Sequence, residues 1–204
     1  MSRYFSFFYQ PGKAFTALIA DENRLAFSLK ALLLTAILYT FVYVFLIFGG
    51  GQPFKPWLNI PMEAYYKYNV FFVAPSMFMG WILAAGVVQL LAKFWKGIGS
   101  FEDNLSVLAI GISIASWATL VHDLLTSFLG AIHVINQHEY EIMLNTPTVW
   151  RTLLWIQFAL YLFAFLFLFS IGIKTAQQIR TGGAIILGFI AFLCYQLFFL
   201  IFNR

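Results

Sequence analysis

The stretch LSVLAIGISIASWATLV (Leu105–Val121) decides the fold, because it carries no charged side chain along its whole length. Its small residues recur at helical spacing: Ala109 is followed by Ser113, and Gly111 by Ala115. Small residues four positions apart let helix backbones approach closely inside membranes. The stretch therefore predicts a transmembrane helix that packs tightly against its neighbours.

Four more stretches are free of charge in the same way, and each is long enough to cross roughly 30 Å of hydrocarbon as a helix. The predicted spans are residues 31–48, 70–92, 105–121, 153–173 and 183–202. The predicted fold class is all-α, an integral membrane bundle of five transmembrane helices with a short N-terminal interfacial amphipathic helix. Residues 1–204 are predicted to form one domain.

The composition agrees with a membrane protein. Hydrophobic residues make up 62% of the chain and charged residues 10%, and the mean hydropathy is +0.84. A soluble domain has about a quarter of its residues charged. Cys194 is the single cysteine, so an intramolecular disulfide is excluded. The basic residues are scattered, which gives no support to nucleic-acid binding.

The first thirty residues predict a cytoplasmic segment at the membrane interface. Pro11 fits the first turn of a short helix over residues 11–20. Phe8, Phe15 and Leu18 would form its apolar face, which is typical of a helix that lies on a membrane rather than crossing it.

Lysine and arginine are distributed unequally between the two sides of the predicted bundle. Eight lie with the N-terminus (Arg3, Lys13, Arg24, Lys30, Lys93, Lys96, Lys174 and Arg180), and four lie opposite (Lys55, Lys67, Arg151 and Arg204). Cytoplasmic loops carry the excess of positive charge. We therefore predict a cytoplasmic N-terminus and an external C-terminus.

Reporter fusions test this orientation. A reporter that is active only in the cytoplasm should be active at the N-terminus and silent at the C-terminus, because five spans place the two ends on opposite sides. Activity at both ends would contradict the count of five.

The size of the side chains predicts which spans are central. Gly80 with Ala84 repeats the small-residue spacing in the second span, so the second and third spans are expected to form the packed centre. Phenylalanines surround the fourth span (Phe158, Phe163, Phe165, Phe167 and Phe169), which predicts a lipid-facing helix. Leucine at Gly80 or Ser113 should then disrupt the fold more than leucine at Phe165.

Three glutamines lie inside the predicted spans: Gln89, Gln157 and Gln196. They are interpreted as partners in helix–helix hydrogen bonds, each worth about 1 kcal/mol or less. The alternative is a polar binding site between helices. Charged residues are absent from the five predicted cores, which counts against a pump or a proton-coupled transporter.

All three histidines of the chain fall in one stretch, residues 122–141, on the predicted external side. The main interpretation is a structural rim, because acidic residues are expected where positive charge is scarce. The alternative is an outward-facing metal site with His122, Asp123, His133 and His138 as ligands. On one straight helix His122 and His133 lie roughly 16 Å apart, so a shared ion requires the helix to break. Gly130 is the obvious place for such a break.

No motif for an enzyme or a cofactor is present. The segment KGIGSF (Lys96–Phe101) lacks the spacing of a phosphate-binding loop, and it is interpreted as a turn into a helix capped by Ser100 and Asp103. No G-x-S-x-G, H-E-x-x-H or C-x-x-C pattern occurs. The sequence predicts a protein that is not an enzyme and needs no cofactor.

The chain resembles the Yip (Ypt/Rab-interacting protein) domain family of multi-pass membrane proteins. The likeness lies in the Phe8–Pro11–Phe15 segment, the five predicted spans, the loop Lys96–Phe101 and the small-residue span after it. The resemblance implies a membrane-embedded domain, and for eukaryotic members an association with Rab-type GTPases in traffic between endoplasmic reticulum and Golgi. The chain lacks their D-L-Y-G-P-type motif, so it is more similar to a prokaryotic member.

These observations lead to a function hypothesis with two alternatives. The first is a non-enzymatic membrane protein that binds protein partners, associates with itself through its small-residue faces, or organises the lipid bilayer. The second is a carrier or channel for a lipid or apolar solute, and the third is the outward-facing metal-binding protein. The expected location is a bacterial or archaeal plasma membrane, with a Golgi or endoplasmic reticulum membrane as the alternative.

Overall fold

The computed structural model describes residues 2–51 and 58–203, and the regular structure within those ranges is helical throughout. The helices are α1 (Ser2–Tyr9), α2 (Pro11–Ile19), α3 (Arg24–Gly49), α4 (Tyr65–Ala92), α5 (Phe101–Ala131), α6 (Gln137–Asn145), α7 (Val149–Gln177) and α8 (Thr181–Asn203). Short 3-10 turns, η1 (Met62–Ala64) and η2 (Lys93–Trp95), flank α4. The predicted all-α fold is confirmed.

Five of these helices, α3, α4, α5, α7 and α8, are long and apolar enough to cross a membrane. Each contains one predicted span and continues past it, because a helix does not need to end where the hydrocarbon ends. The extension is greatest in α5, which was predicted to span 105–121 but continues to Ala131. His122 and Asp123 therefore lie on the same continuous helix as the small-residue stretch.

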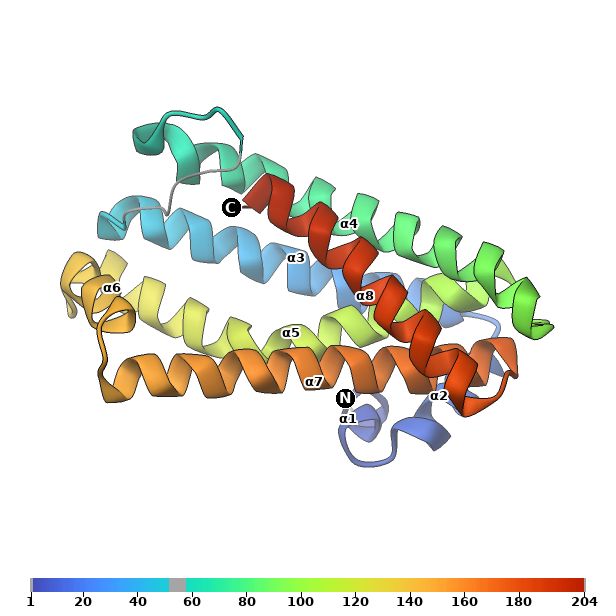
Figure 1. Ribbon diagram of the computed structural model, residues 1–204. Helices are drawn as coiled ribbons and strands as arrows, with labels where there is room; N and C mark the ends of the chain where they lie inside the picture. The colour runs from blue at the N-terminus through green and yellow to red at the C-terminus, as the bar shows by residue number, and fades with distance from the viewer. Residues whose placement is uncertain (1, 52–57, 204) are drawn as a thin grey trace.

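Helix α5 occupies the centre of the bundle, with α3 on one side and α7 on the other (Figure 1). Its side chains from Val107 to Ile110 are completely buried. Gly111 explains the close approach of α7, since a Cβ there would lie 2.7 Å from the Phe169 ring. The prediction of a tightly packed third span is confirmed. Helix α4 lies beside the centre and packs mainly against α8 and α3.

The prediction for the fourth span is wrong in part. Phe158, Phe163 and Phe167 of α7 are exposed as predicted, but Phe165 and Phe169 are completely buried. The Phe165 ring centroid lies 5.3 Å from that of Phe169 and 5.6 Å from that of Tyr195 on α8. Helix α8 crosses this face of α7 and covers it (Figure 1). Large apolar side chains fit both lipid and a protein interior, so their size does not distinguish the two environments.

The N-terminal segment forms two short helices that pack against the bundle. Helix α2 matches the predicted helix over residues 11–20, and its Phe15 and Leu18 are completely buried. The Tyr4 hydroxyl lies 2.9 Å from Ser113 Oγ, and the same hydroxyl accepts from Trp117 Nε1 over 3.0 Å. Ser113 is twelve residues into α5, about 18 Å along its axis. Helix α1 therefore reaches deep along the bundle and is held there by protein contacts.

An ion pair fastens the two ends of this segment. Arg3 at the start of α1 pairs with Asp21, which follows α2. The hydrogen bond from Arg3 lowers the pKa of the Asp21 carboxyl. Arg24, the first residue of α3, forms an ion pair with Asp103 on α5, with 2.8 Å between Nε and Oδ1. The N-terminal segment is thus tied to the same end of the bundle as the loop before α5.

Side-chain hydroxyls cap the starts of both α5 and α7. Ser100 and Asp103 form the predicted capping box, in which each side chain bonds to the other's backbone N–H. Thr148 caps α7, where its hydroxyl accepts from Arg151 N–H over 3.4 Å. Threonine hydroxyls are common N-caps, and Arg151 lies in the first turn of α7.

The intramembrane glutamines form the predicted bonds between helices. Gln157 donates to the Thr119 carbonyl of α5, and Gln196 accepts from the Tyr161 hydroxyl. Gln89 belongs to a buried amide cluster in which Asn104 donates to it over 2.6 Å and Gln177 over 3.2 Å. The amide cluster joins α4, α5 and α7 at one end of the bundle.

Candidate functional site

The stretch of residues 122–141 forms a helical hairpin at the end of the bundle opposite the amide cluster (Figure 1). The chain reverses at His133, whose φ of 58° lies in the left-handed region. Val134 N–H bonds to the Leu129 carbonyl over 2.9 Å, which closes the end of α5. Helix α6 then runs back beside α5. Gly130, the place suggested for a break if the histidines shared a metal ion, remains helical, and the reversal comes three residues later.

The close approach of α6 explains Gly130. A Cβ at this position would lie 2.6 Å from Oε1 of Gln137, the first residue of α6. Gly130 therefore lies against the Gln137 side chain at the start of α6 and does not end α5.

The hairpin brings a tyrosine hydroxyl to His122. Nε2 of His122 lies 2.5 Å from the Tyr140 hydroxyl, and Nδ1 lies 2.9 Å from Oδ1 of Asp123. The carboxylate can only accept, so Nδ1 carries the proton in the neutral imidazole and Nε2 accepts from Tyr140. Burial, and then the negative charge of Asp123, raise the pKa of Tyr140. The Tyr140 ring also packs edge-on against Trp150 of α7.

A cleft of about 270 Å³ opens beside this triad, and we name it the tyrosine cleft. Tyrosines contribute much of its wall, together with two carboxylates, an imidazole and two side-chain amides. Its lining consists of Tyr39, Val42, Tyr43, Leu46, Tyr65, Tyr66, His122, Asp123, Thr126, Ser127, Gln137, Tyr140, Glu141, Leu144 and Asn203. These residues come from α3, α4, α5, α6 and α8, so five helices build one site.

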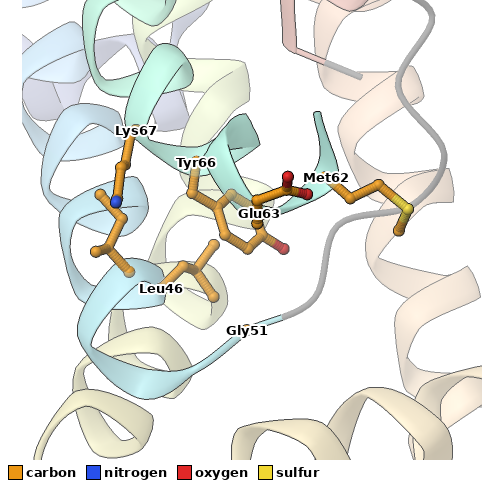
Figure 2. Close-up of a pocket in the computed structure, with 7 residues that line it drawn as sticks. Leu46, Gly51, Met62, Glu63, Tyr66 and Lys67 are labelled. Atoms are coloured by element: carbon orange, nitrogen blue, oxygen red, sulfur yellow. The ribbon is translucent and has the colours of Figure 1, made fainter. Parts of the chain in front are cut away.

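A second cleft of about 400 Å³ adjoins the tyrosine cleft and shares Leu46 and Tyr66 with it. Figure 2 shows the Tyr66 ring above Leu46, with Lys67 on one side and Glu63 on the other. Tyr66 therefore separates a cleft that contains a lysine from the tyrosine cleft.

The four suggested metal ligands are not brought to one point. His122 and Asp123 are in contact, whereas His133 and His138 are exposed and do not line the cleft. Within residues 2–51 and 58–203, no group of three or more His, Cys, Asp or Glu side chains could hold a metal ion. The metal site stays a sequence prediction for which the structure juxtaposes two of four ligands.

Sequence reasoning missed most of the cleft. Tyr39 and Tyr43 are one helical turn apart on α3, and Tyr65 and Tyr66 begin α4, so no short motif joins them. A signal was present in the concentration of tyrosine at the ends of two predicted spans, at the same side as His122. Sequence spacing alone does not show that these ends meet.

A family model, described as the Yip1 domain, matches residues 5–202, nearly the whole chain. The chain belongs to the Yip1 domain family. No curated protein and no solved structure matches it. The resemblance inferred from the sequence is confirmed, and with five membrane-length helices the chain is a multi-pass membrane protein.

The glycine loop that contributed to the resemblance has a structural role in this Yip1 domain. Ile98 N–H bonds to the Gln177 carbonyl over 3.2 Å, and a Cβ at Gly99 would lie 2.2 Å from the Ala176 carbonyl oxygen. Gln89 in turn donates to the Gly99 carbonyl over 3.1 Å. The loop is thus fixed onto the end of α7, in agreement with its interpretation as a turn into a capped helix.

The turn at His133 gives a test of the hairpin. Replacing His133 with glycine is expected to stabilise the Yip1 domain by about 1 kcal/mol, because a left-handed residue with a Cβ costs about that much and glycine does not. His138→Gly is the matched control, since His138 is also exposed but lies in the first turn of α6, where glycine is less favourable than histidine. Thermal unfolding in detergent compares the two variants. A loss of stability at His133 as large as that at His138 would contradict the turn.

Proposed function

We propose that this Yip1 domain is a non-enzymatic membrane protein that binds protein partners. The observation that carries the proposal is the arrangement of α1. One face of α1 is held by the bundle through Tyr4 and the buried Phe7. The other face displays Phe5, Phe8 and Tyr9, with Tyr9 82% exposed. Aromatic side chains on a fixed backbone are the usual anchors of protein interfaces.

The packing of the bundle favours this proposal over a carrier. The four side chains of α5 from Val107 to Ile110 are completely buried. They fill the centre of the bundle, where a path for a solute would run. The side-chain amides of Gln89, Asn104 and Gln177 form hydrogen bonds with one another and so join three helices. Both features support a bundle interior that stabilises the fold rather than one that holds a solute.

The proposed location is a bacterial or archaeal plasma membrane with the N-terminus in the cytoplasm. The charge asymmetry supports this orientation, which would place the exposed aromatic face of α1 on the cytoplasmic half of the protein. Cytoplasmic or membrane-embedded proteins are then the partners that α1 can reach.

Photo-crosslinking in intact membranes tests the proposal. A photoreactive amino acid at Tyr9 is expected to yield a reproducible protein adduct, identified by mass spectrometry. The matched control is Leu160, an exposed apolar residue of α7. Lipid adducts at both positions, without a protein adduct at Tyr9, would overturn partner binding by α1.

One observation favours the carrier as a second candidate. An apolar groove of about 530 Å³ lies between α3 and α5. It is lined by Leu38, Phe41, Phe45, Trp117, Val121, Leu124, Leu125 and Phe128. A labelled-lipid exchange assay in liposomes tests it: exchange that requires the protein, and that stops with Leu125→Trp, would support a lipid carrier.

A further inference from the structure

The tyrosine cleft combines aromatic rings with negative charge. The rings of Tyr39, Tyr43, Tyr65 and Tyr66 form its wall on the α3 and α4 side, and Asp123 lies on the α5 side. The lining, all of it within the described residues, includes no lysine or arginine. Tyrosine faces and a carboxylate both attract a cation, and the attraction strengthens where water is displaced.

Two side-chain amides at the wall have unused acceptors. Gln137 is 6% exposed, and its Nε2 donates to Glu141 over 3.1 Å, while its Oε1 has no hydrogen-bond donor among the described residues. The Asn203 amide is similar: Nδ2 donates to Ser76 and to the Phe199 carbonyl, and Oδ1 has no donor there. Both oxygens are covered by protein atoms, and Gln137 Oε1 lies against Gly130. The acceptors that the lining offers to a ligand are therefore the carboxylates of Asp123 and Glu141.

We propose that the tyrosine cleft binds an organic ammonium group, a cationic nitrogen that carries N–H donors. The rings and Asp123 attract its charge, and the carboxylates of Asp123 and Glu141 accept its hydrogen bonds. A volume of about 270 Å³ suits a head group rather than a large ligand. An anion is disfavoured by the Asp123 charge. The ammonium binding does not depend on the proposed partner binding, because α1 lies elsewhere on the bundle (Figure 1).

The position of the cleft makes it accessible both to lipid head groups and to solutes in water. Tyr65 starts α4 and Asn203 ends α8, so the cleft lies near the ends of membrane-length helices, at the depth of lipid head groups. The same ammonium chemistry is carried by an ethanolamine lipid head group and by a free amine in solution. The test therefore has one arm for each source.

The experiment uses the full chain in nanodiscs of phosphatidylglycerol, a lipid without an amine. In the first arm, saturation-transfer NMR measures the binding of free ethanolamine. In the second arm, native mass spectrometry of protein from mixed membranes compares retained phosphatidylethanolamine with retained phosphatidylglycerol. Ethanolamine binding identifies a soluble source, and selective retention of phosphatidylethanolamine alone identifies the lipid source. Binding in neither arm would overturn the proposal.

Variants connect the binding to the cleft. Asp123→Asn keeps the shape and the acceptor for His122 but removes the charge, and it is expected to weaken binding about tenfold, or about 1.4 kcal/mol. Tyr66→Leu removes one ring and should also weaken binding, which provides a second test if the first variant fails to fold. Glu139→Gln is the matched control, because Glu139 is an exposed acid of α6 outside the lining. Wild-type affinity in both cleft variants, or an equal loss in the control, would overturn the proposal.

Discussion

Alanine at Gly99 is expected to destabilise the protein by about 3 kcal/mol. The added Cβ would lie 2.2 Å from the carbonyl oxygen of Ala176 and 2.8 Å from its carbonyl carbon. These are backbone atoms of α7, so no side-chain rotation relieves the contact. The loop before α5 would have to lift away from α7.

The consequences extend beyond the contact itself. The Gly99 carbonyl accepts from Gln89, and Gln89 accepts from Asn104 and Gln177. Displacing the loop therefore removes a hydrogen bond from the amide cluster inside the membrane-spanning helices, where water does not replace it.

Size-exclusion chromatography after heating in detergent measures the effect of Gly99→Ala. Gly86→Ala is the matched control, because a Cβ at Gly86 meets nothing within 4 Å. The control should unfold at the temperature of the unmodified protein or slightly above it, since alanine is the better helix former. Equal melting temperatures for both variants would show that the loop does not lie against Ala176.

The second large effect is expected at Phe165. Replacing Phe165 with alanine should cost on the order of 3 kcal/mol, because the completely buried ring leaves a cavity among Phe169, Phe192 and Tyr195. In a membrane the loss comes from packing rather than from transfer out of water, so the lower part of the range for such substitutions applies.

Phe163→Ala provides the control on the same helix. The Phe163 ring is 64% exposed on the opposite side of α7, and lipid chains can fill the space that it leaves. Thermal unfolding in detergent should show a large drop for Phe165→Ala and a small one for Phe163→Ala. Similar drops for the two variants would mean that α8 does not cover this face of α7.

A large drop for Phe165→Ala would agree with the buried position of Phe165, whereas the sequence predicted that Phe165 faces lipid. Leucine at Gly80 is still expected to be disruptive, since a Cβ there already lies 3.2 Å from the Tyr195 ring. The sequence identified Gly80 and Gly111 at close contacts correctly because small residues let neighbouring side chains approach. It misplaced Phe165 because a large apolar ring fits both lipid and a protein interior.

At the candidate site, too, the sequence identified some residues correctly and missed others. The sequence drew attention to His122 and Asp123 through their position in the one histidine-containing stretch, and the structure places both at the tyrosine cleft. The two other histidines, His133 and His138, lie outside it. The interactions of Tyr140 with His122 depend on the direction that α6 takes after the turn.

The sequence by itself determined that this protein is a membrane bundle of five helices, because the cost of burying charge and unpaired backbone in lipid is local to each stretch. It also determined the cap at Ser100 and the helix after Pro11, which depend on neighbouring residues. Only the tertiary structure decided which face of α7 meets α8, how deeply α1 reaches along α5, and where α6 lies against Gly130. Each of these depends on residues far apart in the chain whose approach is set by packing. Side-chain type limits such contacts, but it does not select among them.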